Sequence, residues 1–246
     1  MVTVDRWQAA QKYEQGYWQS LAARIADGSV AQLEWYDWRA NELAKRLRRL
    51  GLGTFADGTA RVIEVGCGPI GVVSYYPARE RLAIDPLEEF YGANPVLSAL
   101  RNPAVDYRRG MGEDLPAETG QYDLAIMENC IDHVQDMDAV MQELKRVLKP
   151  NGILYLTVNA RIPIGFVVHR ALSRLRIDAG HPHTFTKGRV RSFVARNGFD
   201  LVDFDSETFL SALKGDITAK GSRPKIKALL GTSEFIVTVI ARPNTT

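Results

Sequence analysis

The chain has few cysteines, and their scarcity bears on its cellular compartment. Only Cys67 and Cys130 occur among 246 residues, which excludes the disulfide framework of a small secreted protein. Both lie in apolar segments, so we expect reduced thiols packed inside the fold. No apolar run reaches the roughly 18 residues that a membrane helix needs, and the first residues lack the apolar stretch of a secretory signal peptide. The sequence therefore predicts a cytoplasmic protein without a membrane partner.

An excess of charge of one sign is also absent. Lysine and arginine number 31 against 29 aspartate and glutamate residues, which leaves a net charge of +2. A nucleic-acid-binding surface usually carries a broad basic patch, so we expect no nucleic-acid partner. Internal repeats and low-complexity tracts are missing as well. A length of 246 residues suits one large domain, alone or with an appendage, and is compatible with a homodimer.

One glycine-rich stretch, residues 61–72, organises the rest of the chain. It begins with an apolar run that predicts a buried strand. Three glycines follow that strand: Gly66, Gly68 and Gly71. Glycines let a backbone approach a ligand closely, and a following helix N-terminus offers free N–H groups. The stretch therefore predicts a ligand-binding loop at the end of a strand.

From this strand onward, segments of strand type alternate with helical ones. The predicted strands are 61–65, 81–84, 105–108, 122–127, 153–158, 199–206 and 234–241. The predicted helices are 71–76, 87–100, 134–148, part of 164–176, and 187–196. Such alternation is typical of an α/β domain with a largely parallel sheet.

Residues 1–55 predict a helical extension ahead of this domain. Apolar residues recur at helical spacing up to Gly51, and Gly28 marks a break between two helices. Tryptophans and tyrosines are dense near the N-terminus; we interpret them as core packing, with a lid over a ligand as the alternative. The main domain then spans 56–246.

Acidic or amide residues follow the next three predicted strands. Asp85 lies about 20 residues past the glycines, where a dinucleotide-type site places an acid on ribose hydroxyls. Glu113 and Asp114 follow the third strand, where an acid can accept a hydrogen bond from an adenine amino group. Asn129 follows the fourth strand. Together these positions predict an adenosine-containing ligand.

A nicotinamide oxidoreductase is one candidate for such a ligand site. The loop from Gly66 to Gly71 satisfies the G-x-G-x-x-G pattern. Two features argue against this interpretation. The predicted helix after the glycines is short, and a second acidic position follows the third strand.

Five short motifs occur in a specific order. They are Glu64-Val-Gly-Cys-Gly68, Ile84-Asp-Pro86, Gly112-Glu-Asp-Leu-Pro116, Tyr122-Asp-Leu124 with Asn129, and Arg146-Val-Leu-Lys-Pro-Asn-Gly152. In this order they resemble the motifs of class I S-adenosylmethionine-dependent methyltransferases, of the small-molecule, type 11-like group. The resemblance covers about residues 60–160 and extends to 241. It implies an α/β, Rossmann-like fold, with a seven-stranded mixed sheet whose last strand is antiparallel and with helices on both faces.

The resemblance also implies S-adenosyl-L-methionine as the cofactor and suggests where it binds. The glycine loop would follow the methionine part, Asp85 would hold the ribose, and Asn129 would lie near the sulfonium. An acid after the third strand, with Leu115, would contact adenine. The cofactor-binding candidates are Glu64, Gly66, Cys67, Gly68, Asp85, Pro86, Glu113, Asp114, Leu115 and Asn129.

Histidines are the candidates for chemistry on the acceptor. Methylation of a hydroxyl is helped by a base whose pKa lies near neutrality. The catalytic candidates are His133, His181 and His183. Each has a structural alternative, because His133 opens a predicted helix and the other two precede Thr186, a predicted helix N-cap. A pair of histidines two residues apart, with no clustered cysteine or aspartate, is a weak metal signal, so we predict no metal site.

The sequence thus predicts methyl transfer to a small-molecule acceptor, with oxygen as the favoured position, by SN2 displacement at the sulfonium. Segments 160–185 and 209–233 are expected to be insertions that wall the acceptor pocket. Protein or RNA methylation is an alternative, because basic residues recur in 161–176 and 214–227. A nicotinamide-dependent oxidoreductase remains the alternative from another class.

Overall fold

The computed structural model describes residues 1–30, 33, 35–174 and 180–244. Seven strands form one sheet in the order β3-β2-β1-β4-β5-β7-β6. They are β1 (Arg61–Val65), β2 (Glu80–Asp85), β3 (Asp106–Arg109), β4 (Tyr122–Glu128), β5 (Leu148–Ala160), β6 (Phe199–Ser206) and β7 (Phe235–Pro243). The first five strands are parallel, whereas β7 runs antiparallel to both β5 and β6. The predicted mixed sheet with an antiparallel last strand is confirmed.

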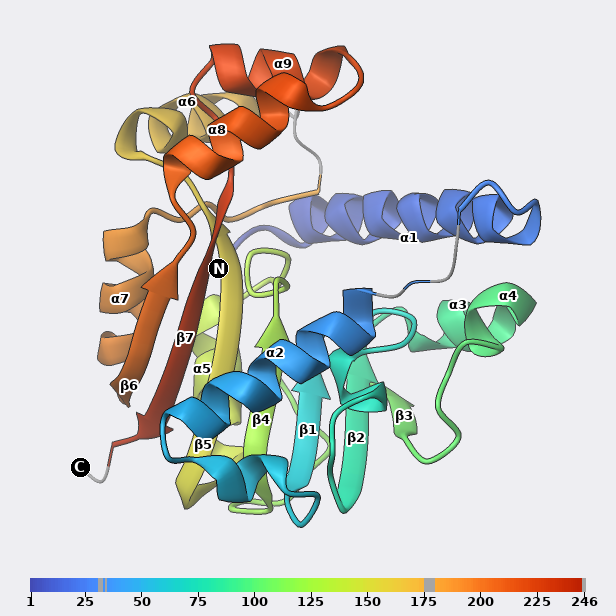
Figure 1. Ribbon diagram of the computed structural model, residues 1–246, viewed down its shortest axis with the longest axis vertical. Helices are drawn as coiled ribbons and strands as arrows, with labels where there is room; N and C mark the ends of the chain where they lie inside the picture. Colours follow the sequence, from blue (N-terminus) through green and yellow to red (C-terminus); the bar gives the residue numbers. More distant parts are fainter. Residues whose placement is uncertain (31–32, 34, 175–179, 245–246) are drawn as a thin grey trace.

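Helices surround this sheet (Figure 1). They are α1 (Val4–Ala26), α2 (Trp35–Arg49), α3 (Glu88–Ala93), α4 (Pro95–Ser98), α5 (Met137–Val147), α6 (Pro163–Arg174), α7 (Lys187–Arg196), α8 (Phe209–Thr218) and α9 (Ser222–Leu229), with short 3-10 turns η1 (Gly53–Ala56) and η2 (Val72–Ser74). No helix within the described ranges is long and apolar enough to cross a membrane.

Two helix predictions are wrong in detail. The single helix expected over 87–100 is divided into α3 and α4, because Pro95 has no N–H and disfavours helical backbone at the residue before it. Asn94 is extended there, and its side chain accepts hydrogen bonds from the first N–H groups of α4. The helix expected over 71–76 is only the turn η2. Of the helix expected over 164–176, residues 175 and 176 lie outside the described ranges.

Alternate residues of the central strands build two cores, one on each face of the sheet. Val62 on β1 packs in the same core as Leu43 of α2, whereas its neighbour Ile63 packs with Val140 and Leu144 of α5. This alternation follows from the two-residue period of a strand. In Figure 1, α2 crosses the front of the sheet and α5 lies behind it. Helices on both faces are therefore confirmed.

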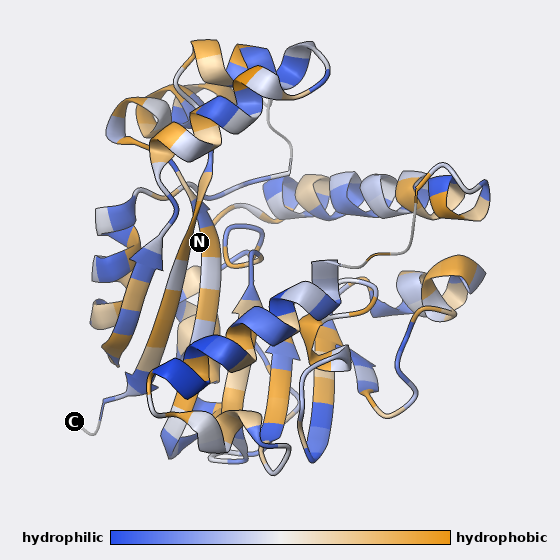
Figure 2. Cartoon of the chain, in the orientation of Figure 1, coloured by the Kyte–Doolittle hydropathy of each residue, from blue (hydrophilic) through white to orange (hydrophobic). Residues whose placement is uncertain are grey.

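The two N-terminal helices belong to the front core. Trp18 of α1 and Tyr36 of α2 are buried in it beside residues of the sheet. Arg46 of α2 also forms ion pairs with Asp203 (2.6 Å) and Asp205 (3.2 Å) on β6. Figure 2 shows hydrophobic central strands behind the hydrophilic outer face of α2. The boundary at residue 55 between an extension and a main domain stays a prediction.

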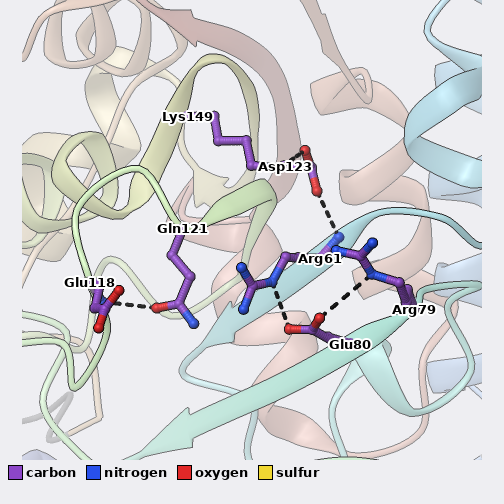
Figure 3. Close-up of polar contacts among 7 residues, drawn as sticks. All are labelled: Arg61, Arg79, Glu80, Glu118, Gln121, Asp123 and Lys149. Carbon is purple, nitrogen blue, oxygen red and sulfur yellow. Dashed lines mark hydrogen bonds and ion pairs between the residues drawn. The ribbon is translucent and has the colours of Figure 1, made fainter.

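The amino-terminal edge of the sheet is held by surface charges (Figure 3). Asp123 accepts hydrogen bonds from the backbone N–H of Arg61 (2.8 Å) and from Lys149 Nζ (2.7 Å). Glu80 pairs with Arg61 (2.6 Å) and with Arg79 (3.5 Å). Exposed pairs of this kind each contribute about 0–1 kcal/mol, so we assign this edge a structural role. The carboxyl ends of the strands lie at the opposite edge.

At that opposite edge, a buried carboxylate fastens the turn after β1. Glu64 is 2% exposed, and its two oxygens accept hydrogen bonds from the backbone N–H groups of Val72 (3.1 Å) and Val73 (2.7 Å). Burial raises the pKa of Glu64 to about 8, although these N–H groups oppose the shift. Gly71 has φ +81° and ψ 149°, a region open essentially to glycine alone.

The absent side chain of Gly71 provides a first test. In Gly71→Ala the new Cβ would lie 2.6 Å from Glu64 Oε2 and 3.1 Å from Cys67 Cβ, and the backbone strain alone costs about 1–3 kcal/mol. We expect chemical denaturation to show a loss of at least that size. Gly16→Ala on α1 is the matched control, because the new Cβ has no neighbouring atom within 4 Å. Replacing glycine with alanine inside a helix stabilises it by up to about 1 kcal/mol. An unchanged stability of Gly71→Ala would contradict the described turn.

The raised pKa of Glu64 predicts a pH dependence of stability. The folded protein keeps this proton up to about pH 8, whereas the unfolded chain releases it near pH 4.5. The folded state binds more protons between these values, so its stability falls as pH rises through that window, by at most about 1.4 kcal/mol per pH unit. Denaturation measured between pH 5 and pH 9 should show a shallower fall for Glu64→Gln than for the parent. Equal slopes would contradict the assignment.

Candidate active site

A cavity of about 430 Å³ lies at the carboxyl ends of β1, β2 and β4. The loops that follow β1, β2, β3 and β4 form one side of it, and residues of α1, α2 and the segment before α7 form the other. Figure 1 shows α1 lying across the carboxyl ends of the strands. Ligands of α/β sheets bind at this edge. Trp18 and Tyr36 line the cavity and are also buried in the core. These N-terminal aromatic residues therefore pack in the core and also cover the cavity.

The glycine loop after β1 forms the floor of the cavity. Gly66 (φ 73°) and Gly68 (φ 61°) both adopt left-handed backbone. A side chain on Gly66 would collide with the thiol of Cys130, and one on Gly68 would press on the Tyr36 hydroxyl at 3.2 Å. Both cysteines line the cavity, and burial raises the pKa of each thiol well above its usual value. They therefore remain protonated and pack rather than act as nucleophiles.

Asp85 joins the glycine loop to the turn after β2. It is 7% exposed, and its oxygens accept hydrogen bonds from the backbone N–H groups of Gly68 and Leu87, each at 2.9 Å. Burial raises the pKa of Asp85 to about 6, against the effect of these two N–H groups. Pro86, the next residue, also lines the cavity. Each carboxylate oxygen retains a second lone pair for a ligand hydroxyl.

Of the residues predicted after β3, the structure brings only one to the cavity. Glu113 lines it, and Glu113 Oε1 accepts hydrogen bonds from the backbone N–H groups of Gln135 (2.9 Å) and Asp136 (3.0 Å). Asp114 is exposed to solvent, whereas Leu115 is buried in the same core as the apolar residues of α5. Neither of these two is among the described residues that line the cavity.

The end of β4 presents two buried acceptors to the cavity. Asn129 has φ 53°, a left-handed conformation that asparagine tolerates better than most residues. Asn129 Oδ1 and Glu128 Oε2 are both buried without a hydrogen-bond partner among the described residues. The other oxygen of Glu128 pairs with Arg39 Nε of α2 at 3.1 Å. Burial raises the pKa of Glu128 to about 7, against the effect of Arg39.

Two of the three predicted histidines meet at one end of the cavity. His133 and His181 both line it, with ring centroids 4.7 Å apart. The structure does not bring His183 there, because His183 Nε2 is hydrogen-bonded to the Val134 carbonyl (2.9 Å). Burial lowers the pKa of His183. His183 therefore anchors the segment before α7 to the loop after β4.

The two predicted insertions differ in their relation to the cavity. Segment 160–185 contributes His181 to the wall, and its residues 175–179 lie outside the described ranges. Segment 209–233 forms α8 and α9, and no described residue of it lines the cavity. Arg223 of α9 donates a hydrogen bond to the Tyr13 hydroxyl of α1 at 3.4 Å.

Sequence reasoning missed three contributors to this site. Glu128 was passed over although an acid ending an apolar strand is an available signal. Arg39 lies on a helix far away in the sequence, and only the packing of α2 brings it to Glu128. Asp132 lies next to His133 and could be mistaken for the cap of the following helix, but Asp136 caps α5.

Comparison with known proteins agrees with this arrangement. A family model described as a methyltransferase domain, type 11, matches residues 63–156. A ubiquinone biosynthesis O-methyltransferase of Xanthomonas oryzae pv. oryzae is 36% identical over 113 residues, which make up 44% of this chain and 47% of that protein. A homologous enzyme of Xanthomonas axonopodis pv. citri is 35% identical over the same length. The match thus spans about half the length of these curated relatives.

Solved structures extend the similarity over the whole fold. The [4+2]-cyclase SpnF superposes with a TM-score of 0.66 at 17% identity, covering 98% of this chain and 97% of its own. An S-adenosylmethionine-dependent methyltransferase from Mesorhizobium loti superposes with a TM-score of 0.55 at 18% identity, covering 80% and 96%. At such identities the likeness concerns the fold alone. Residues 63–156 match the type 11 methyltransferase domain, and the fold around them is that of class I S-adenosylmethionine-dependent methyltransferases.

Proposed function

We propose that this protein transfers the methyl group of S-adenosylmethionine to an oxygen atom of a small-molecule acceptor. The main support for this proposal is a cavity with a glycine loop and several acidic residues along one side and two histidines at one end. The methyltransferase domain supports the donor, and the O-methyltransferase relatives support oxygen as the acceptor atom. A cavity of about 430 Å³ suits small ligands rather than a folded macromolecule.

The described residues fit the donor in their chemistry. Gly66 and Gly68 have no side chain where a methionine moiety would pass. Asp85 would accept hydrogen bonds from the ribose diol, and Glu113 from the adenine amino group. Glu64 would act indirectly, because both of its oxygens hold the loop in place. Cys67 and Pro86 would flank the donor by contact.

The buried acceptors after β4 suit a positive charge. Glu128 Oε2 and Asn129 Oδ1 have no partner among the described residues, and a buried unpaired oxygen is costly unless a ligand satisfies it. A sulfonium beside them would meet that need. The bound donor supplies an activated methyl group. The enzyme's main task is then alignment, which alone can contribute several kcal/mol.

The acceptor would lie against His133 and His181. An acceptor hydroxyl must lose its proton for its oxygen to become a strong nucleophile, and a side chain near neutral pKa assists that loss. Both rings are at the cavity wall, whereas His183 is committed to a backbone carbonyl. We therefore assign the chemistry at the acceptor to His133 and His181 and omit His183.

Cofactor binding tests the donor half of this proposal. Calorimetry should show that S-adenosylhomocysteine binds and that NADH does not compete. Asp85→Ala should weaken that binding by about 1–3 kcal/mol, the scale of a hydrogen bond to a charged group. Asp114→Ala is the matched control, because this acid is exposed and lies away from the cavity. Tight NADH binding without S-adenosylhomocysteine binding would favour the oxidoreductase instead.

A methyl-transfer screen tests the acceptor half. The protein is incubated with methyl-labelled S-adenosylmethionine and a panel of hydroxylated small molecules, and label is also sought in added protein and RNA. His133→Ala should lower turnover by about 100-fold or more, the range of acid–base assistance, while its affinity for S-adenosylhomocysteine stays within twofold of the parent. Label found only in protein or RNA would refute the small-molecule assignment. Unchanged turnover in His133→Ala would remove this residue from the chemistry.

A further inference from the structure

Three possible metal ligands meet beside the acceptor end of the cavity. The ligand atoms of Asp132, His133 and His181 all lie within 4.8 Å of one another. Asp132 and His133 follow β4, and His181 belongs to the segment before α7, 48 residues further along the chain. His183 fixes this meeting, because its backbone N–H donates to the Asp132 carbonyl (3.2 Å) and its ring bonds to Val134.

Asp132 provides a second observation at the same place. It is 3% exposed, and Asp132 Oδ1 has no hydrogen-bond partner among the described residues. His133 Nε2 lies 3.8 Å from Asp132 Oδ1, which is beyond hydrogen-bond distance. A buried carboxylate oxygen without a partner is unfavourable unless a ligand satisfies it. One carboxylate oxygen of Asp132 lies within 4.8 Å of a ring nitrogen of each histidine, so the three groups could share a cation.

We propose that Asp132, His133 and His181 hold one divalent transition-metal ion, and that the acceptor oxygen binds to this ion. Two imidazoles and one carboxylate form the ligand set of sites that keep open positions for a substrate. Imidazole suits ions such as Zn²⁺, which binds nitrogen and carboxylate oxygen at about 2.0–2.2 Å. Two ligands of one tetrahedral ion lie about 3.4 Å apart, so the 3.8 Å pair and the other ligand atoms, all within 4.8 Å of one another, need side-chain rotations to close on an ion.

The charge around the cluster favours a cation. The cavity wall carries the carboxyl groups of Glu14, Glu64, Asp85, Glu113 and Glu128, against one guanidinium, Arg39, among the described lining residues. A bound cation favours the ionised form of these acids, and their negative charge then lowers the electrostatic cost of placing a metal ion near a sulfonium.

The ion would act on the acceptor, so this inference rests on the proposed function. A hydroxyl that coordinates a divalent ion becomes much more acidic, as zinc lowers the pKa of its bound water to about 7. In this arrangement His133 and His181 act through the ion rather than as bases, and the acceptor's proton passes to solvent water. Its oxygen then forms a bond to the methyl carbon while the carbon–sulfur bond breaks and the electron pair stays on sulfur. The products are a methyl ether, S-adenosylhomocysteine and one proton.

The ligand count also specifies the class of acceptor. Three protein ligands leave at least one open position on the ion, and two when it becomes five-coordinate. Two adjacent oxygen donors on one acceptor fill two such positions and fix which oxygen points at the methyl group. We therefore expect a vicinal diol, a catechol-like ring or a hydroxy ketone to be preferred over a compound with one isolated hydroxyl.

Metal binding is measured on the full chain, without reference to activity. The protein is dialysed against a chelator and then titrated with Zn²⁺ by calorimetry, and with Co²⁺ by visible absorption. We expect one ion per chain. Asp132→Asn and His181→Ala should each weaken Zn²⁺ binding by at least about 10-fold, the lower bound for removing even an outer partner of a metal site. Glu128→Gln is the matched control, since it removes a buried carboxyl of the same wall outside the cluster.

Unchanged melting temperatures of all three variants, and unchanged S-adenosylhomocysteine affinities of Asp132→Asn and His181→Ala, would show that the variants are folded. No Zn²⁺ binding by the parent, or equal binding by Asp132→Asn and His181→Ala, would overturn the metal site. If the parent binds Zn²⁺ but methyl transfer is unchanged after a chelator has removed the ion, the role of the ion in catalysis is overturned. Zn²⁺ binding with the expected variant pattern, but no methyl transfer to any acceptor, would support the site and refute the proposed function alone.

Discussion

The hydrogen bonds that Glu64 accepts from Val72 and Val73 determine where the rest of the site lies. A carboxylate buried inside a strand is unusual, and here it closes the glycine loop back onto the strand that precedes it. The closure requires that residue 71 has no Cβ, because a Cβ there would collide with Glu64. In the same way, Cys130 packs against Gly66 only because Gly66 has no Cβ. Once the loop is closed, the Gly68 N–H reaches Asp85 at 2.9 Å, and the floor of the cavity is joined to the next strand. The ligand-facing backbone is thus a consequence of one buried acid.

The same acids explain the electrostatics of the cavity. Burial raises the pKa of Asp85, Glu128 and Glu64 to about 6, 7 and 8. Each shift means that the ligand-free cavity disfavours negative charge on these groups. A bound cation reverses that preference, because it supplies the charge that water supplies elsewhere. Binding of a cationic ligand and ionisation of the acids in the cavity wall are therefore coupled. Arg39, which pairs with Glu128, is the one arginine among the described lining residues that supplies positive charge to these acids.

Local signals in the sequence were sufficient for most of the fold and for the glycine-loop side of the site. Strands such as 61–65 and 199–206 were predicted at their observed bounds because their apolar runs end at glycine or polar turns. Asp85 and Glu113 follow strands, so parallel pairing alone brings them together. The division at Pro95 had a local signal and was missed. Arg39 and His181 could not be brought to the site by local signals, because Glu128, Asp132 and His133 are distant from them in sequence and only tertiary packing unites them.

The two sides of the cavity differ in origin, and this bears on specificity. The matched domain, 63–156, contains the glycine loop and the acids after β2 and β3, together with Asp132 and His133. Trp18, Tyr36 and His181, which close the cavity from the other side, lie outside it. SpnF, a [4+2]-cyclase, has the same fold at 17% identity, so the fold does not determine the reaction. The helices before the matched domain and the segment after it supply the closing side of the cavity, and among these closing residues His181 brings an imidazole to Asp132 and His133.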